Sequence, residues 1–285
     1  MRYLSTLLSR SRALSLVFGA ALALLGLAAC DSGGSMSGAS PGTLAVNFQT
    51  TSTSSSSSAT SLLKSAHDSV VVQGANGDEL KITDIRFIVE EFELGGQADS
   101  LDFEAPPSFL DLPLNGTEFA SADTADVPVG TYTEFEFAVD NLEPDEDDTQ
   151  KEQQRIQDLL NRIREEFPNV PKEASMIVVG TFTPADGDPK NFTSYIEAEI
   201  EVEREFEQNP LEVTSDGLSR SLTVKLDPST WFKTSEGGVR NLAQYQSTDD
   251  LLEIEKEFEN GVVNVEIGGG NDDDGEDDGS DGSDG

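Results

Sequence analysis

The sequence predicts a mainly β protein, an antiparallel β-sandwich with one inserted amphipathic helix and a short C-terminal helix. Several segments alternate apolar and polar residues, as strands with one buried face do. Turn-forming residues separate these segments. Only one long segment, residues 144–168, places its apolar residues at helical spacing. Residues 43–267 together have the length of a single sandwich domain.

The N-terminal segment has the pattern of a bacterial secretion signal. Residues 13–29 form an apolar run, preceded by three arginines, and no acidic residue occurs before Asp31. The sequence Leu27-Ala28-Ala29-Cys30 supplies the aliphatic residue, small residues and cysteine that a lipoprotein signal peptidase recognises. A transmembrane anchor is the alternative, but the run is short and lacks a positive flank after it. We therefore expect residues 1–29 to be removed and Cys30 to carry the lipid.

Lipidation would place the protein in the bacterial cell envelope, bound to a membrane through its N-terminal lipid. We favour the outer membrane, and leave open whether the protein faces the periplasm or the cell surface. Cys30 is the only cysteine, so no disulfide can stabilise the domain. Its stability must come from packing.

The chain is very acidic. Without residues 1–29 it holds 15 basic and 55 acidic side chains, a formal net charge of −40. Nucleic acids and anionic membrane surfaces are therefore poor partners. Molar salt shortens the Debye length to about 3 Å and would relieve the repulsion. We expect a halophilic source, the alternative being an ordinary acidic protein with a charged tail.

The first half of the folded part is rich in strands. Residues 30–42 are rich in Gly and Ser and predict a flexible tether. A strand is expected at 43–48, and the Ser/Thr run at 50–61 predicts a long loop. Further strands are expected at 70–72 and across 80–94, where the apolar positions change phase. A β-bulge would explain that change.

A turn and a strand precede the helical segment. Residues 126–130 have turn chemistry, and residues 132–139 alternate, with Glu134 and Glu136 on the outer face. In the predicted helix at 144–168, acidic residues near the start favour the positive end of the helix dipole. Its apolar stripe is expected to pack on the sandwich. That stripe comprises Ile156, Leu159, Leu160, Ile163 and Phe167.

The second half returns to strands. Strands are expected at 175–183, at 218–226 and at 262–267, the last of these closing a sheet edge. The clearest alternation is at 195–207, where glutamates occupy every outward position from Glu197 to Glu207. Residues 248–258 predict the short C-terminal helix, capped by Thr or Asp.

Three segments resemble a family of bacterial lipoprotein domains of unknown function. They are residues 82–87, residues 109–112 and the sequence Val127-Pro128-Val129-Gly130-Thr131-Tyr132, which leads into a strand. The resemblance implies a transthyretin-like or carbohydrate-binding-like β-sandwich from Gly42 to Phe232, and it brings no established activity. The predicted helix at 144–168 departs from the family, in which a hairpin is expected there.

The sequence offers little for catalysis. His67 is the only histidine, so a catalytic triad, a zinc site or a copper site would each depend on it alone. No Gly-rich phosphate-binding loop of either common type is present. We expect no enzyme, but a non-catalytic binding or structural module of the envelope, with another envelope protein as one candidate partner.

A carbohydrate-binding adhesin is the first alternative function. Sugars stack on exposed aromatic faces flanked by polar groups. The candidate residues are Trp231, Phe232, Tyr195 and Tyr245. Trp231 and Phe232 follow Asp227-Pro228 at the end of a strand, so they are also expected to plug the base of the sandwich.

A calcium-dependent adhesin is the second alternative, resting on the tail at 268–285. This Gly/Asp/Ser segment is expected to be disordered without a cation. Asp274, Glu276 and Asp278 partly imitate a calcium loop, but Gly285 stands where an EF-hand has a bidentate Glu. Only weak calcium association is expected, and no other cofactor.

Overall fold

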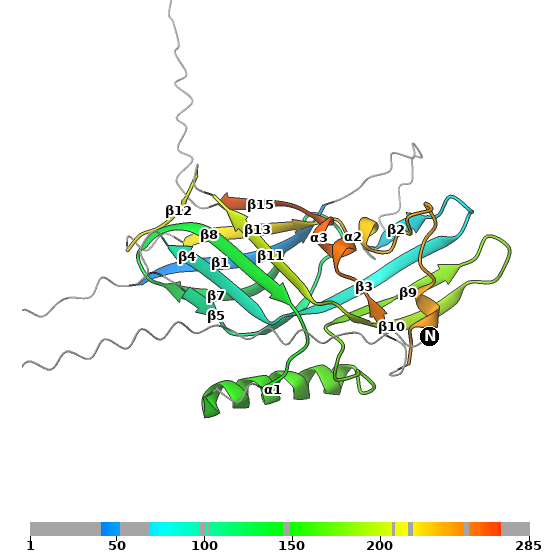
Figure 1. The fold of residues 1–285 in the computed structure, drawn as a ribbon, viewed down its shortest axis with the longest axis horizontal. Helices are drawn as coiled ribbons and strands as arrows, with labels where there is room; N and C mark the ends of the chain where they lie inside the picture. Colours follow the sequence, from blue (N-terminus) through cyan, green and yellow to red (C-terminus); the bar gives the residue numbers. More distant parts are fainter. Residues whose placement is uncertain are drawn as a thin grey trace, which may run out of the picture. The chain divides into compact units, whose positions relative to one another are not determined.

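The computed structural model describes residues 41–51, 69–96, 101, 103–144, 149–206, 209–215, 219–247 and 251–268. These residues all belong to one compact unit, built mainly of strands in three sheets (Figure 1). The predicted β-sandwich is confirmed. Most strand pairs are antiparallel, but two are parallel, which the sequence did not predict.

The first sheet, sheet A, has four strands. Its order is β15 (Val262–Gly268), β13 (Ser219–Leu226), β1 (Gly42–Thr50) and β7 (Ala120–Val127). The two central strands, β1 and β13, are parallel although far apart in sequence. Strand β15 lies at an edge, as expected for residues 262–267.

The second sheet, sheet B, has six strands. They run in the order β14 (Leu252–Glu253), β10 (Lys190–Glu197), β9 (Met176–Thr183), β3 (Glu79–Val89) and β2 (Val70–Gln73), with β6 (Ser108–Asp111) also paired to β3. The short strand β14 joins β10 in parallel. All other pairs in this sheet are antiparallel.

The third sheet, sheet C, has five strands. Its order is β11 (Ile200–Glu205), β8 (Gly130–Val139), β4 (Glu91–Gly96) and β5 (Phe103–Ala105), with β12 (Leu211–Val213) also paired to β8. Tyr132 in β8 is fully buried, and its hydroxyl donates a hydrogen bond to the carbonyl of Pro128 at 2.8 Å. This bond closes the turn before β8, much as a tyrosine corner does in other sandwiches.

Aromatic rings connect the three sheets in one main core. Phe48 of β1 contacts Phe87 of β3, with ring centroids 5.7 Å apart, and Phe137 of β8, at 5.4 Å. Both contacts are edge-to-face, a favoured geometry for aromatic pairs. Phe87 in turn contacts Phe258, which stacks on Trp231 at 4.4 Å.

Two continuous chain segments pass from sheet B into sheet C. Strand β3 leads into β4 through Glu90, and β10 leads into β11 through Ala198 and Glu199. The predicted single strand at 195–207 is therefore two strands, although its alternation of buried and exposed residues continues across the break. The predicted bulge within 80–94 is confirmed, because the pairing of β3 with β9 skips Thr83.

Helix α1 (Gln150–Glu166) covers part of the outer face of sheet B (Figure 1). Its N-cap Thr149 forms a capping box with Glu152, which satisfies two free backbone groups. Three residues of the predicted stripe, Ile156, Leu159 and Ile163, are buried in a second core with apolar residues of the sheet. The predicted helix is confirmed. Within the described ranges, no helix is long and apolar enough to span a bilayer.

The predicted C-terminal helix at 248–258 is wrong for most of its length. Leu252–Glu253 is strand β14, because Leu252 and Ile254 are buried at a spacing of two. Only a single helical turn follows, α3 (Lys256–Glu259). Two other short helices precede it in sequence, α2 (Pro228–Trp231) and the 3-10 helix η1 (Leu242–Gln244).

Candidate functional site

An open hollow of about 400 Å³ lies on the outer face of sheet B, beyond the area that α1 covers. Its volume is in the usual range for small-ligand sites. All the lining residues are uncharged. They come from β3, β9, β10 and the segment after η1: Thr83, Val179, Gly180, Thr181, Asn191, Phe192, Thr193 and Gln246.

Strand register places these side chains together. Val179 of β9 pairs with Thr193 of β10, and Thr181 pairs with Asn191. Residues two apart on a strand face the same way, so both pairs point outward. The bulge in β3 adds Thr83 to this face, since Asp84 pairs with Val179 and Thr83 is the extra residue. Bulges often redirect a side chain in this way.

A glycine supports the hollow from below. A Cβ at Gly180 would lie 2.2 Å from the carbonyl oxygen of Lys81 and 2.9 Å from the ring of Phe192. Both distances are too short for any larger residue. Gly180 therefore lets β3 approach β9 closely and keeps the Phe192 ring in the core below the hollow.

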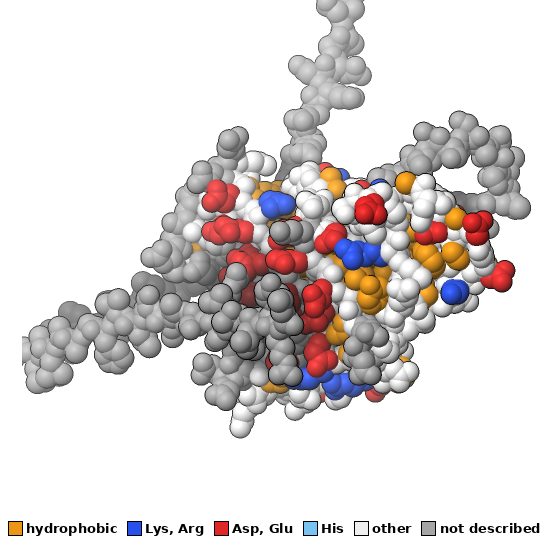
Figure 2. Space-filling model, turned by 45° about the vertical axis from the view of Figure 1, so that its right-hand side comes forward, with side chains coloured by type: hydrophobic (Ala, Val, Ile, Leu, Met, Phe, Trp, Pro, Cys, Tyr) orange, Lys and Arg blue, Asp and Glu red, His pale blue; other side chains and the backbone are white. Residues whose placement is uncertain are grey.

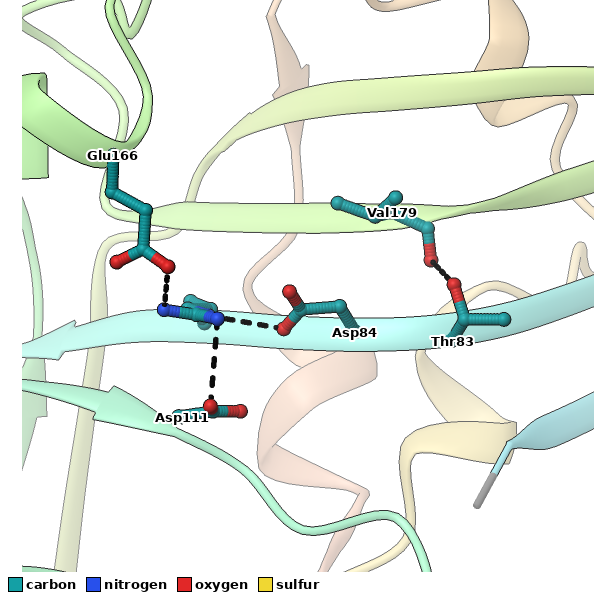
Figure 3. Close-up of polar contacts among 6 residues, drawn as sticks. Thr83, Asp84, Asp111, Glu166 and Val179 are labelled. Atoms are coloured by element: carbon teal, nitrogen blue, oxygen red, sulfur yellow. Dashed lines mark hydrogen bonds and ion pairs between the residues drawn. The ribbon is translucent and has the colours of Figure 1, made fainter. Parts of the chain in front are cut away.

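Hydrogen bonds fix two of the hydroxyl groups. The hydroxyl of Thr83 donates to the carbonyl of Val179 at 3.3 Å (Figure 3). The hydroxyl of Thr181 donates to Oδ1 of Asn191 at 2.9 Å. These bonds orient the hydroxyl oxygens of both threonines and the amide group of Asn191.

Arg86, three residues after Thr83 on β3, connects three elements. Its guanidinium pairs with Asp84 at 3.1 Å, with Asp111 of β6 at 3.4 Å and with Glu166 at the end of α1 (Figure 3). The same group lies 5.5 Å from the ring centroid of Phe167, within cation–π range. Arg86 thus attaches the end of α1 to sheet B.

Charges and burial act against each other in this cluster. Burial lowers the pKa of Arg86. The hydrogen bond and charge of Asp84, together with the charges of Asp111 and Glu166, raise this pKa by more than burial lowers it, so the net shift is upward. Burial raises the pKa of Asp84, and Arg86 only partly offsets this. The cluster is best suited to holding structure, because each of its groups already has a partner.

The outer face of sheet C contrasts with the hollow. Strand register aligns Glu104, Glu93, Glu136 and Glu203 side by side across four strands, and we call them the glutamate row. Like charges directly opposite one another destabilise a sheet. Burial, the hydrogen bond and charge of Glu91, and the neighbouring glutamates raise the pKa of Glu93 to about 7. Figure 2 shows many acidic side chains in a band near the centre and left of the view, and hydrophobic side chains gathered to the right with a few charged ones among them.

A smaller hollow of about 250 Å³ is acidic. Glu197, Glu199, Ile254 and two further glutamates, Glu253 and Glu255, line it. Burial raises the pKa of Glu197, and the charges of Glu199 and Glu253 add to this. Among the described residues, no group of three or more acidic, His or Cys side chains is arranged to hold a metal ion.

The aromatic residues proposed to bind sugars do not form an exposed platform. Trp231 and Phe232 are 0% exposed and lie in the main core. The prediction that these two residues bind a sugar is therefore wrong, and the alternative, that they fill the base of the sandwich, is correct. Burying the large apolar surface of these two side chains stabilises the folded state more than leaving it exposed to water would. Tyr195 is 6% exposed because α1 packs against it, and Tyr245 is half-buried on the main core.

The structure does bring Tyr195 and Tyr245 together, since the amide of Tyr195 donates to the carbonyl of Tyr245 at 3.1 Å. This bond places Gln246 beside the hollow. Sequence reasoning missed the hollow itself. One signal was present, because the outward positions of β9 and β10 up to Thr193 are uncharged in a chain with 55 acidic residues.

Several predicted features lie outside the described residues. They are the signal peptide, Cys30, the tether up to residue 40, residues 52–61 of the Ser/Thr run, His67, and residues 269–285 of the tail with Asp274, Glu276 and Asp278. Their assignments stay predictions.

Comparisons with known proteins add little. No protein-family model and no curated protein matches this chain. Among solved structures, MbnP from Methylosinus trichosporium is similar, with a TM-score of 0.32 and 12% sequence identity, over 68% of this chain and 82% of that chain. A likeness at this level carries no argument about function.

Proposed function

We propose that this protein is a lipid-anchored, non-catalytic module of a bacterial cell envelope, which binds a ligand in the uncharged hollow on sheet B. The main support for ligand binding is the hollow itself. It is large enough for a ligand, and its lining is neutral in a chain of net charge −37. Side chains with hydroxyl and amide groups supply several hydrogen-bonding groups in one place.

The anchor is supported by the sequence. The apolar run at 13–29 and the residues Leu27-Ala28-Ala29-Cys30 have the pattern of a lipoprotein signal. A lipid on Cys30 would fix the protein to a membrane, with the outer membrane favoured. The test is labelling of the producing cells with a palmitate analogue. The wild type should be labelled and Cys30→Ser should not, and equal labelling of both would contradict the anchor.

The surface charge supports a halophilic source. The glutamate row places like charges opposite one another across four strands. In molar salt the Debye length falls to about 3 Å, which weakens this repulsion. The melting temperature should therefore rise steadily with KCl concentration. A melting temperature that does not change with salt would contradict this part of the proposal.

Hydrogen exchange tests the binding site. The full-length protein in detergent is exposed separately to mannan oligosaccharides, oligogalacturonate, spermine, CaCl2 and a neutral polar peptide. At least one probe should slow amide exchange in β9 and β10 and leave β15, on another sheet, unchanged. The bound probe should be recovered uncleaved. If no probe protects β9 and β10, or if cleavage occurs, the proposed function is wrong.

A further inference from the structure

The hydrogen bonds around the hollow determine which groups a ligand must offer. Thr83 and Thr181 each use their hydroxyl proton on a protein acceptor, so their oxygens face a ligand as acceptors. Asn191 uses Oδ1 to accept from Thr181, so its Nδ2 remains as a donor. The lining therefore presents two hydroxyl oxygens as acceptors and one amide group as a donor. A ligand whose groups both donate and accept, such as adjacent hydroxyls, fits this pattern.

The charges of the protein disfavour both anionic and cationic ligands in the hollow. The lining is uncharged, and the two charged residues in register with it, Lys81 opposite Thr181 and Asp84 opposite Val179, have opposite signs. Asp84 is already paired with Arg86. An anion would be repelled by the net charge of −37, and a cation would find stronger fields at the glutamate row. A neutral ligand therefore fits the hollow best.

The floor of the hollow is apolar. Val179 and Phe192 are the apolar side chains of the lining, and Val179 pairs with Thr193 across the strands. Phe192 is almost fully buried, so it offers an edge but no open face for stacking. An oligosaccharide matches both kinds of lining residue. Its C–H groups can contact the apolar side chains, while its hydroxyl groups form hydrogen bonds with Thr83, Thr181 and Asn191. Without stacking, each site binds weakly, and many copies on a membrane would raise the overall affinity.

We infer that the hollow binds a neutral, polyhydroxylated ligand, a segment of an uncharged polysaccharide. This inference rests on the proposed function and specifies its ligand class. It assigns Asn191 as a hydrogen-bond donor to the sugar, and Thr83 and Thr181 as acceptors.

The test is calorimetric titration of the full-length protein in detergent with neutral oligosaccharides of mannan, dextran and xylan. Oligogalacturonate, spermine and a neutral polar peptide serve as comparisons. A neutral oligosaccharide should bind, with a Kd that changes less than about twofold between about 0.1 M and 1 M KCl, because neither partner's charge contributes. The comparison probes should not compete with it.

Two matched substitutions locate the contact. Asn191→Leu removes the amide at nearly constant volume and should weaken oligosaccharide binding about tenfold, the effect of losing one to two hydrogen bonds. Asn161→Leu makes the same change on the exposed side of α1 and should leave binding unchanged. Unchanged melting of both variants confirms that they are folded.

The outcomes separate the two proposals. If a charged probe or the peptide binds and Asn191→Leu weakens it, the proposed site stands and the neutral-glycan inference is wrong. If no probe binds, both fail. Equal losses in Asn191→Leu and Asn161→Leu would place the sugar elsewhere and overturn the inference.

Discussion

The hydroxyl of Ser175 donates to the carbonyl of Ala198 at 2.9 Å and accepts from the amide of the same residue at 2.7 Å. Ala198 lies where β10 ends and β11 begins, so its backbone groups lie outside the ladders of both sheets. Ser175 is 2% exposed, and its own amide donates to Ile196 while its carbonyl accepts from Ile88. One serine therefore satisfies the backbone at the junction of two sheets.

Replacing Ser175 with Ala should destabilise the protein by about 1 to 3 kcal/mol, because two buried backbone groups of Ala198 lose their partner. Urea unfolding measures the change. Ser121→Ala, at an exposed position in β7, is the control and should change the stability by less than about 0.5 kcal/mol. Equal effects of the two substitutions would show that the junction does not depend on Ser175.

Tyr132→Phe should destabilise the protein by about 1 kcal/mol or somewhat more. The substitution keeps the buried ring and removes only the hydroxyl that donates to Pro128. Tyr245→Phe removes a hydroxyl from a half-buried ring and should have a smaller effect. The prediction fails if thermal unfolding of Tyr132→Phe matches that of the wild type.

Arg86→Met should destabilise the protein by about 2 kcal/mol and loosen α1. The substitution leaves Asp84, Asp111 and Glu166 without their shared cation, at a site that is only partly open to solvent. Hydrogen exchange should speed up in the last turns of α1. Arg162→Met, on the exposed side of the same helix, should change neither quantity. Unchanged exchange in Arg86→Met would contradict the role of this cluster.

Glu93→Gln should stabilise the protein above neutral pH. The folded state raises the pKa of Glu93 from 4.5 to about 7 and so binds its proton more tightly than the unfolded state. The free energy of unfolding therefore falls as pH rises from 4.5 to about 7. Solvent screening limits the expected gain to about 0.5 to 1 kcal/mol.

Unfolding measured across this pH range checks the prediction. The gain should vanish below pH 4.5, where Glu93 is neutral in both states, and it should shrink in molar salt. Glu118→Gln makes the same change at an exposed position between β6 and β7 and is the control for the substitution itself. A gain that is constant with pH would rule out titration of Glu93 as the cause.

Period-two and helical patterns were enough to predict most elements. The alternation at 132–139 and the stripe at 144–168 correspond to β8 and α1, because in each case one face is buried against a single apolar layer. Within residues 196–202, the alternation was also correct about which residues are buried. It could not reveal the break at Ala198, because moving from one sheet to another keeps the same side of the chain inside.

The candidate site was not predictable in the same way. Aromatic residues attracted attention as sugar-binding groups, but Trp231 and Phe232 are large enough that the core needs them. The hollow depends on the register between β9 and β10 and on a bulge at Thr83, and register is a long-range property. Nor does local sequence indicate that Arg86 meets Glu166, 80 residues away.

The position of β1 in sheet A has a consequence for how the chain folds. Residues 43–50 pair in parallel with residues 219–226. Strand β1 therefore cannot form this pairing until β13, far later in the chain, is present. Contacts this distant in sequence make folding slow. A chain emerging from the ribosome N-terminus first cannot complete sheet A until nearly all of it has been made. Until then, the residues of β1 lack the parallel partner that they have in the folded protein.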